Sequence, residues 1–398
     1  MNSVYILESI RTPRAKAKES GGLHDLNPHE LLNSLYKYLT DNQILNSEEL
    51  EEVILGCVTQ QGEQAGNIAK SSSMYAQLPD KVSGITLNRF CSSSLDAINM
   101  GYLKIASGQN NIVIAGGIEM MSRVPMLSDK AAIWVDVDIA LKSKIFMMGS
   151  GADLISSINE ITRIEADTQA LNSQKKASFA QKNNFFKSII SVKNNIKNII
   201  CSTDECIREN VTLESLGALK PSFEELGKKG IDKIQLEYFP HLKKISHIHT
   251  AGNSPAMADA AAMTLLSNSK ISSSGHRFRA TIKAVAVVND DPLLVLSGCL
   301  KATQKLLLDV NMTVKDIDLF ELHEAFASTI IYAQKSLHIP DDKLNVNGGC
   351  IALGHPMGAT GSIMLSSLLD EMERQNLATG IVATSGAAGA GTAILIER

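Results

Sequence analysis

Cysteine, tryptophan and long apolar runs are all scarce in this chain of 398 residues. Its six cysteines are too few and too scattered for a disulfide scaffold, so we expect a reducing compartment, the cytoplasm. No stretch approaches the roughly 18 consecutive apolar residues of a membrane span. No basic segment precedes an apolar one near Met1. From these absences we expect neither a membrane protein nor a secreted protein.

An excess of positive charge is also absent. The chain carries 38 Lys and Arg against 42 Asp and Glu, a formal net charge of −4. We therefore expect no nucleic acid and no anionic membrane as a partner.

The length exceeds the roughly 250–300 residues that one hydrophobic core supports, which predicts either several domains or a duplicated one.

Short runs rich in Val and Ile alternate with stretches of helical period, a pattern typical of α/β proteins with buried strands. The expected strands are Val4–Leu7, Val53–Leu55, Ile112–Ala115, Ala280–Val288, Leu319–Leu322 and Ile381–Thr384. Helices are expected between them, so the predicted fold class is α/β.

Two stretches look like distant copies of one another. Asn88–Cys91 leads into a helical segment and then a strand that ends in two glycines, and Asn347–Cys350 leads through a glycine-rich loop and a helix to a similar strand. Asn347 follows Asn88 by 259 residues. A duplicated α/β unit explains both stretches, and chance similarity of strand-loop-helix units is the alternative.

The region between the copies has a different composition, with many Lys, Asn and Ser and few strand signals. We interpret residues 121–250 as an inserted loop or cap domain that includes the return to the N-terminal half. Residues 1–120 then form the first part of the N-terminal half, and residues 251–398 the C-terminal half. The pairs Lys175-Lys176 and Lys228-Lys229 are predicted to be solvated, with phosphate contacts as the alternative.

Cys91 lies where an expected strand ends and a helix begins. Leu95, Ile98, Tyr102 and Ile105 recur at helical spacing after it. A thiol at a helix N-terminus has a pKa below the roughly 8.5 of free cysteine, which predicts a nucleophile. A small buried cysteine is the alternative interpretation.

Two histidines occupy equally distinctive positions. Residues 345–361 contain five glycines and His355, and such a loop brings backbone N–H groups close to a substrate. His355 is suited to accept a proton from a nearby thiol. His323 begins a His-Glu-Ala-Phe stretch at an expected strand-to-helix junction, although His323 and Glu324 are also consistent with a structural pair.

The motif with Cys91, the stretch that begins at His323 and the loop with His355 follow one another along the chain, and together they resemble the thiolase family. The resemblance extends from Arg11-Thr12-Pro13 through Thr250-Ala251-Gly252-Asn253 to Ile396-Glu397. It implies a thiolase-like fold with two duplicated halves in five αβαβα layers and a loop domain over a coenzyme A channel. It also implies a homodimer or homotetramer, for which Ile112–Ala115 is a candidate edge strand.

The resemblance implies roles for the site residues. Cys91 would take an acyl group from acyl-CoA as a thioester, with His355 activating it and His323 helping to hold a water in an oxyanion hole. The reaction would cleave 3-ketoacyl-CoA with coenzyme A or condense two acyl-CoA molecules. Coenzyme A is then a substrate or product, and no permanently bound cofactor is expected. We expect no metal, because Cys201 with Cys206 and His247 with His249 lack partner ligands at recognisable spacing.

The family's second catalytic cysteine corresponds here to Ser385, whose hydroxyl is far less acidic than a thiol. We expect Ser385 to remain part of the catalytic set. Phe326 and Ala387 are expected to contact coenzyme A, with Ala387 and Ala388 replacing glycines beside a second oxyanion hole. Two alternatives to a complete thiolase remain. One is an acyltransferase or hydrolase that uses only the first half-reaction, and the other is a non-catalytic acyl-CoA binder.

Overall fold

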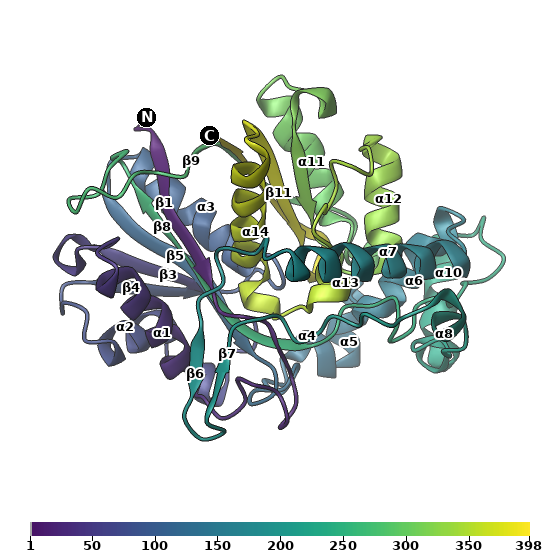
Figure 1. Cartoon of the computed structure of the whole chain (residues 1–398). Coiled ribbons are helices and arrows are strands. Elements are labelled where there is room, and N and C mark those ends of the chain that lie inside the picture. The colour runs from purple at the N-terminus through teal and green to yellow at the C-terminus, as the bar shows by residue number, and fades with distance from the viewer. Residues whose placement is uncertain (1) are drawn as a thin grey trace.

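A ten-stranded mixed sheet runs through the computed structural model, which describes residues 2–398 (Figure 1). The strands are β1 (Val4–Arg11), β2 (Ala15–Lys16), β3 (Glu52–Gly56), β4 (Ser83–Leu87), β5 (Ile112–Met120), β8 (Ala258–Ser267), β9 (Ala280–Asn289), β10 (Leu319–Leu322), β11 (Thr379–Ser385) and β12 (Ala390–Glu397). A separate hairpin consists of β6 (Val192–Asn194) and β7 (Ile199–Cys201). Each of the six expected strands is present.

The order β10-β11-β12-β9-β1-β8-β5-β3-β4 contains the same pattern twice, and β2 pairs separately with β8. In the N-terminal half β3 is parallel to β5, and β8 is antiparallel to both β5 and β1. In the C-terminal half β10 is parallel to β11, and β12 is antiparallel to both β11 and β9. The two sets meet where β1 pairs with β9. The predicted duplication is therefore confirmed.

The helices form three layers around this sheet (Figure 1). They are α1 (Pro28–Asp41), α2 (Ile68–Tyr75), α3 (Ser93–Ala106), α4 (Ala132–Val135), α5 (Val137–Ser143), α6 (Met148–Ile158), α7 (Arg163–Lys182), α8 (Leu213–Gly217), α9 (Glu224–Leu226), α10 (Asp232–Tyr238), α11 (Gly298–Asp309), α12 (Ala327–Leu337), α13 (Cys350–Leu353) and α14 (Thr360–Gln375). None of the helices within residues 2–398 is both long and apolar enough to cross a bilayer.

Three apolar cores define the five layers. The central core joins α3 and α14 to strands of both halves, with Leu95 and Leu365 packed among Val113 and Val382. A second core packs α1 and α2 on the N-terminal half of the sheet, and a third packs α11 and α12 on the C-terminal half. The predicted αβαβα arrangement is present, and it buries α3, the helix that follows Cys91, in the middle of the molecule.

Two expectations about the strands need correction. β5 lies between β3 and β8, so Ile112–Ala115 is not an edge strand, whereas β4 pairs with β3 alone and is one. β8 belongs to the sheet of the N-terminal half, and for that reason we place the boundary between the halves after Ser267, not at residue 251.

The region between the halves forms a cap of helices α4 to α10 and the β6–β7 hairpin. Helix α7 rests on the C-terminal half, where Ala166 and Ala170 pack against Ala327, Ile331 and Ile351. This contact places the cap against the strand ends at which the site lies.

Asp153 in α6 fixes the chain that leads into one wall of the site. Its carboxylate accepts hydrogen bonds from Nδ1 of His247 (2.8 Å), from Nδ1 of His249 (2.6 Å) and from two backbone N–H groups. Nε2 of His247 also donates to Asp232 at 3.0 Å. The carboxylate partner that sequence spacing did not show is therefore Asp153, 94 residues before His247.

The hydrogen bond between His247 and Asp153 should make the free energy of unfolding depend on pH. The hydrogen bond to Asp153, supported by Asp232, raises the pKa of His247 to about 9. Since this value exceeds the ordinary pKa of about 6.5, the stabilisation is complete below about pH 6.5 and disappears as the pH rises through about 9. We expect His247→Gln to lower the free energy of unfolding at pH 6.5 more than at pH 9.5, measured by urea denaturation. An equal loss at both pH values would contradict this assignment.

Candidate active site

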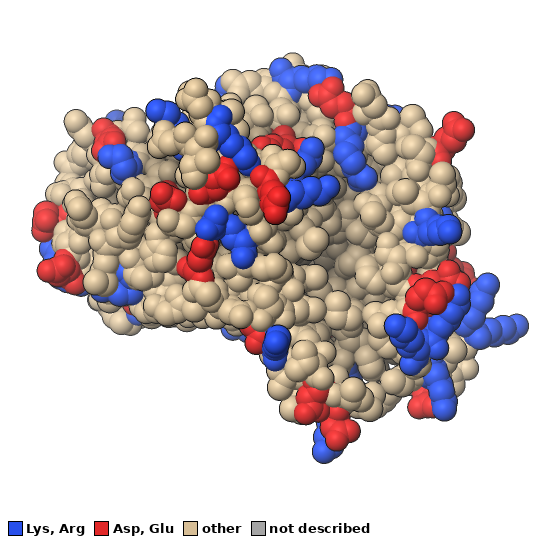
Figure 2. All heavy atoms as spheres, turned by 90° about the horizontal axis from the view of Figure 1, so that it is seen from below, with Lys and Arg blue, Asp and Glu red and all other residues tan. Residues whose placement is uncertain are grey.

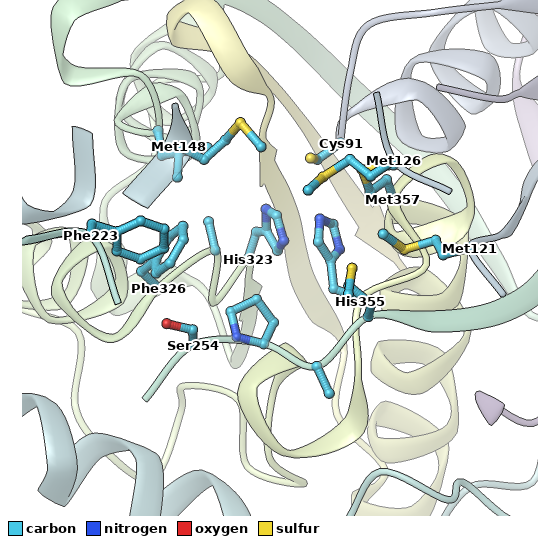
Figure 3. Close-up of a pocket in the computed structure, with 15 residues that line it drawn as sticks. Cys91, Met121, Met126, Met148, Phe223, Ser254, His323, Phe326, His355 and Met357 are labelled. Atoms are coloured by element: carbon cyan, nitrogen blue, oxygen red, sulfur yellow. The ribbon is translucent and has the colours of Figure 1, made fainter. Parts of the chain in front are cut away.

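Cys91, His323 and His355 line one cavity of about 180 Å³. Cys91 comes from the segment between β4 and α3, His323 follows β10, and His355 follows α13. Figure 3 shows the two imidazole rings side by side with the Cys91 thiol beyond them. The structure thus brings together three side chains that lie far apart in the sequence.

A tight turn presents Cys91 to this cavity. The preceding residue, Phe90, has a left-handed φ of 51°, which non-glycine residues adopt rarely. The Ser93 hydroxyl supports the turn by accepting from Arg89 N at 2.9 Å and donating to the Phe90 carbonyl at 2.5 Å. Backbone strain of this kind persists where the surrounding structure enforces it, and here it positions the thiol.

Burial raises the pKa of Cys91 to about 12, and the nearby Glu119 adds to this rise. The predicted lowering by a helix N-terminus is therefore wrong. Helix α3 begins only at Ser93, and the cost of placing a thiolate in a buried site exceeds the benefit of the helix dipole. A thiol in these surroundings acts as a nucleophile only when a base takes its proton.

His355 has the tautomer that such a base requires. Its Nδ1 lies 2.7 Å from Oγ1 of Thr360, and that hydroxyl donates its own proton to the Pro356 carbonyl at 3.0 Å. Oγ1 must therefore accept from Nδ1–H, which leaves the lone pair on Nε2. Burial, with His323 adding to its effect, holds the pKa of His355 well below its usual value, so the ring is neutral.

His323 has the same tautomer for a similar reason. Its Nδ1 donates to the backbone carbonyl of Ser385 at 3.1 Å, and Nε2 has no hydrogen-bond partner among residues 2–398. Burial lowers the pKa of His323 to about 4. The centroids of the two rings lie 4.5 Å apart, so two neutral imidazoles with unprotonated Nε2 atoms stand next to each other.

The Ser385 hydroxyl does not line the cavity. It donates to the Leu296 carbonyl and accepts from the backbone N–H of Cys299, both at 2.9 Å, and the residue is fully buried. This geometry argues against the expected proton transfer by that hydroxyl. The contribution of Ser385 to the site is its carbonyl, which orients His323.

The two residues expected to contact coenzyme A line different cavities. Phe326 lines the cavity of the histidines and packs edge-on against Phe223, with centroids 5.8 Å apart. Ala387 lines a second cavity of about 230 Å³ that also reaches Cys91. The next residue, Ala388, has a left-handed φ of 61°, so the loop keeps a backbone shape that suits glycine better.

Glu119 has a structural role that no sequence pattern indicates. Its buried carboxylate accepts from the backbone N–H groups of Val58 (2.9 Å), Thr59 (3.1 Å) and Gly358 (2.9 Å). It thereby ties a loop of the N-terminal half to the loop that follows His355. Only the folded structure shows this connection, since a single buried Glu has no recognisable spacing.

Glu324 is also structural, but its partners differ from the expected one. Its carboxylate accepts from the Ser173 hydroxyl at 2.7 Å, from Gln169 at 3.0 Å and from the backbone N–H of Ile351 at 3.1 Å. It therefore connects helix α7 of the cap to the start of α13, and no hydrogen bond joins it to His323 within residues 2–398.

Comparisons with known proteins agree with this architecture over the whole chain. Residues 4–230 match the family described as "Thiolase, N-terminal domain", and residues 276–398 match "Thiolase, C-terminal domain". Proteins named 3-ketoacyl-CoA thiolase from Colwellia psychrerythraea and Shewanella frigidimarina are 35% and 34% identical, with complete coverage of both chains. The crystal structure of the Bacillus anthracis acetyl-CoA acetyltransferase superposes with a TM-score of 0.85 at 31% identity, covering 100% of this chain and 99% of that one.

The fold and the full-length relatives define an acyltransferase. The chain belongs to the thiolase family. The resemblance seen in the sequence is thus confirmed, and the protein has thiolase-type activity on acyl-CoA.

The Thr360 hydroxyl provides a test of the His355 tautomer. We expect Thr360→Val to lower kcat/KM by about tenfold or more, because the ring loses the acceptor that fixes Nδ1–H. Thr303→Val is the matched control, since Thr303 is buried and donates to a carbonyl four residues earlier in the same way. Equal kinetic effects of the two substitutions would contradict the assignment.

Proposed function

We propose that this protein cleaves 3-ketoacyl-CoA with coenzyme A and catalyses the reverse condensation. The observation that carries this proposal is the convergence of Cys91 with His355, whose Nε2 lone pair is fixed by Thr360. The names of the full-length relatives support the same substrate class.

The reaction proceeds in two steps. Nε2 of His355 accepts the Cys91 proton as the sulfur attacks the 3-keto carbon, and the C2–C3 bond breaks to give an acyl-Cys91 thioester and the enolate of the shorter acyl-CoA. The imidazolium of His355 returns its proton to C2 of that enolate. Coenzyme A then attacks the thioester, His355 accepts the proton of its thiol, and Cys91 leaves as the thiolate and recovers a proton.

The two cavities at Cys91 fit the two arms of such a substrate. The cavity with His323 and His355 also contains Ser254, and it would hold the pantetheine arm and the reacting carbonyls. The second cavity is lined by apolar side chains that include Leu127, Ile133 and Trp134, and it would hold the acyl chain.

A lysine-rich surface supports this orientation. Phe223 lines the first cavity, and the exposed lysines Lys220, Lys228, Lys229, Lys233, Lys243 and Lys244 lie in the segment around it. Figure 2 shows basic side chains gathered at one end of this face of the molecule, together with several acidic ones. Only Lys228 among the six forms an ion pair within residues 2–398. We place the phosphates of coenzyme A near this surface.

Acyl transfer without carbon–carbon cleavage is the second candidate function. The position of the Ser385 hydroxyl favours it, because no second acid or base from that position reaches the cavity. Cys91 and His355 suffice to form a thioester and pass the acyl group to water or to another acceptor.

We further propose a homodimer or homotetramer in the cytoplasm. The free edge of β4 supports the assembly, because Ile85 and Leu87 are only half-buried and an unpaired strand edge accepts a second copy. Six free thiols are consistent with a reducing compartment.

Consumption of a 3-ketoacyl-CoA in the presence of coenzyme A tests the main proposal. We expect Cys91→Ala to lower turnover at least about a thousandfold, because no thioester forms. Cys201→Ala, which removes a buried thiol of the β6–β7 hairpin, is the control and is expected to stay near wild type. If folded wild-type protein gave no acyl-CoA products, the main proposal would be contradicted. Acyl transfer to another acceptor would then remain as the candidate function.

Filling the second cavity tests the place of the acyl chain. Ala131 lines that cavity and its neighbour Ala132 does not. We expect Ala131→Phe to lower kcat/KM for a long-chain 3-ketoacyl-CoA about tenfold relative to acetoacetyl-CoA, because the aromatic ring occupies the space of several methylene groups. Ala132→Phe is expected to leave this ratio unchanged. If both variants had the same ratio of the two kcat/KM values, the acyl chain would not bind in the second cavity.

A further inference from the structure

A second thiol, that of Cys350, lies beside the two histidines and takes no part in the proposed reaction. Cys350 begins α13, is buried, and is the residue that corresponds to Cys91 in the duplicated half. Its Sγ and one nitrogen from each of His323 and His355 all lie within 4.8 Å of one another. Two imidazoles and a thiol at this separation are the ligand types that bind zinc in proteins.

The hydrogen bonds of the two imidazole rings leave one nitrogen of each ring unprotonated and able to bind a metal ion. Each Nδ1–H is held by an oxygen, the Ser385 carbonyl for His323 and the Thr360 hydroxyl for His355. Histidines that bind metals donate their other ring N–H to an oxygen in this way, which leaves the ligating lone pair free. Nε2 of His323 is fully buried and has no partner among residues 2–398, so it is a polar atom that the rest of the chain leaves unsatisfied.

We propose that His323, Cys350 and His355 form a binding site for Zn²⁺. The three side chains give a His₂Cys set with a fourth position open to the cavity that both histidines line. Zn–N and Zn–S bonds of roughly 2.0–2.3 Å require the ligand atoms to approach one another by about 1 Å. Zn²⁺ reaches the site through the cavity, and the bound ion occupies the lone pair that accepts the Cys91 proton.

Two opposing effects act on the Cys350 thiol, since burial disfavours a thiolate and the guanidinium of Arg14 favours one. Arg14 is itself buried, and its Nε and Nη1 have no partner within the described chain. A coordinating thiol gives up its proton to solvent, so binding releases one proton and weakens as the pH falls.

A titration of the purified, chelator-treated protein with Co²⁺ and with Zn²⁺ tests the site. We expect one ion per chain and a thiolate-to-cobalt absorption band in the wild type. Cys350→Ala is expected to lose this band and to weaken Zn²⁺ binding at least about tenfold in competition with a chromophoric chelator. His323→Asn is expected to keep the band and to weaken Zn²⁺ binding.

The control is Cys201→Ala, which is expected to bind both metals as the wild type does. Thermal unfolding of each variant without metal shows whether it has folded. Absence of stoichiometric binding in the wild type, or equal Zn²⁺ affinity in folded Cys350→Ala and wild type, would overturn the proposal. None of these readouts involves turnover, so a failed thiolysis assay leaves this result interpretable.

Discussion

Two hydrogen bonds determine what the site can do, and each holds the Nδ1 side of an imidazole, that of buried His323 or that of partly buried His355. Thr360 fixes His355, and the Ser385 carbonyl fixes His323. Burial keeps both rings neutral by lowering their pKa values, and it raises the pKa of Cys91 to about 12. The thiol and both imidazoles are therefore uncharged before the proposed reaction begins. In that reaction the tautomers decide where the proton of Cys91 goes.

The site also depends on the meeting of the two halves of the chain. Cys91 comes from the N-terminal half, and both histidines come from the C-terminal half. The carboxylate of Glu119 joins a loop of the first half to Gly358. In the duplicated arrangement Cys350 corresponds to Cys91, so the symmetry of the fold brings a second thiol to the same pair of rings. The proposed nucleophile and the proposed metal ligand thus occupy equivalent positions in the two halves.

Ser385 shows how a position changes its role when its side chain changes. Its hydroxyl is fully used by backbone groups at the start of α11, while its carbonyl still orients His323. The backbone of β11 therefore keeps its part in the site. In the proposed reaction His355 therefore has to serve both as base and as acid.

Periodicity and motifs in the sequence determined the fold class, six strands, the duplication and the three side chains of the cavity. These features depend on local patterns that survive in one dimension. The sequence pattern did not predict strand β8, because its alanines have low strand propensity. The pKa of Cys91, the direction of the Ser385 hydroxyl and the convergence of Cys350 with the histidines were decided by tertiary structure alone, because burial and contacts between distant segments set them.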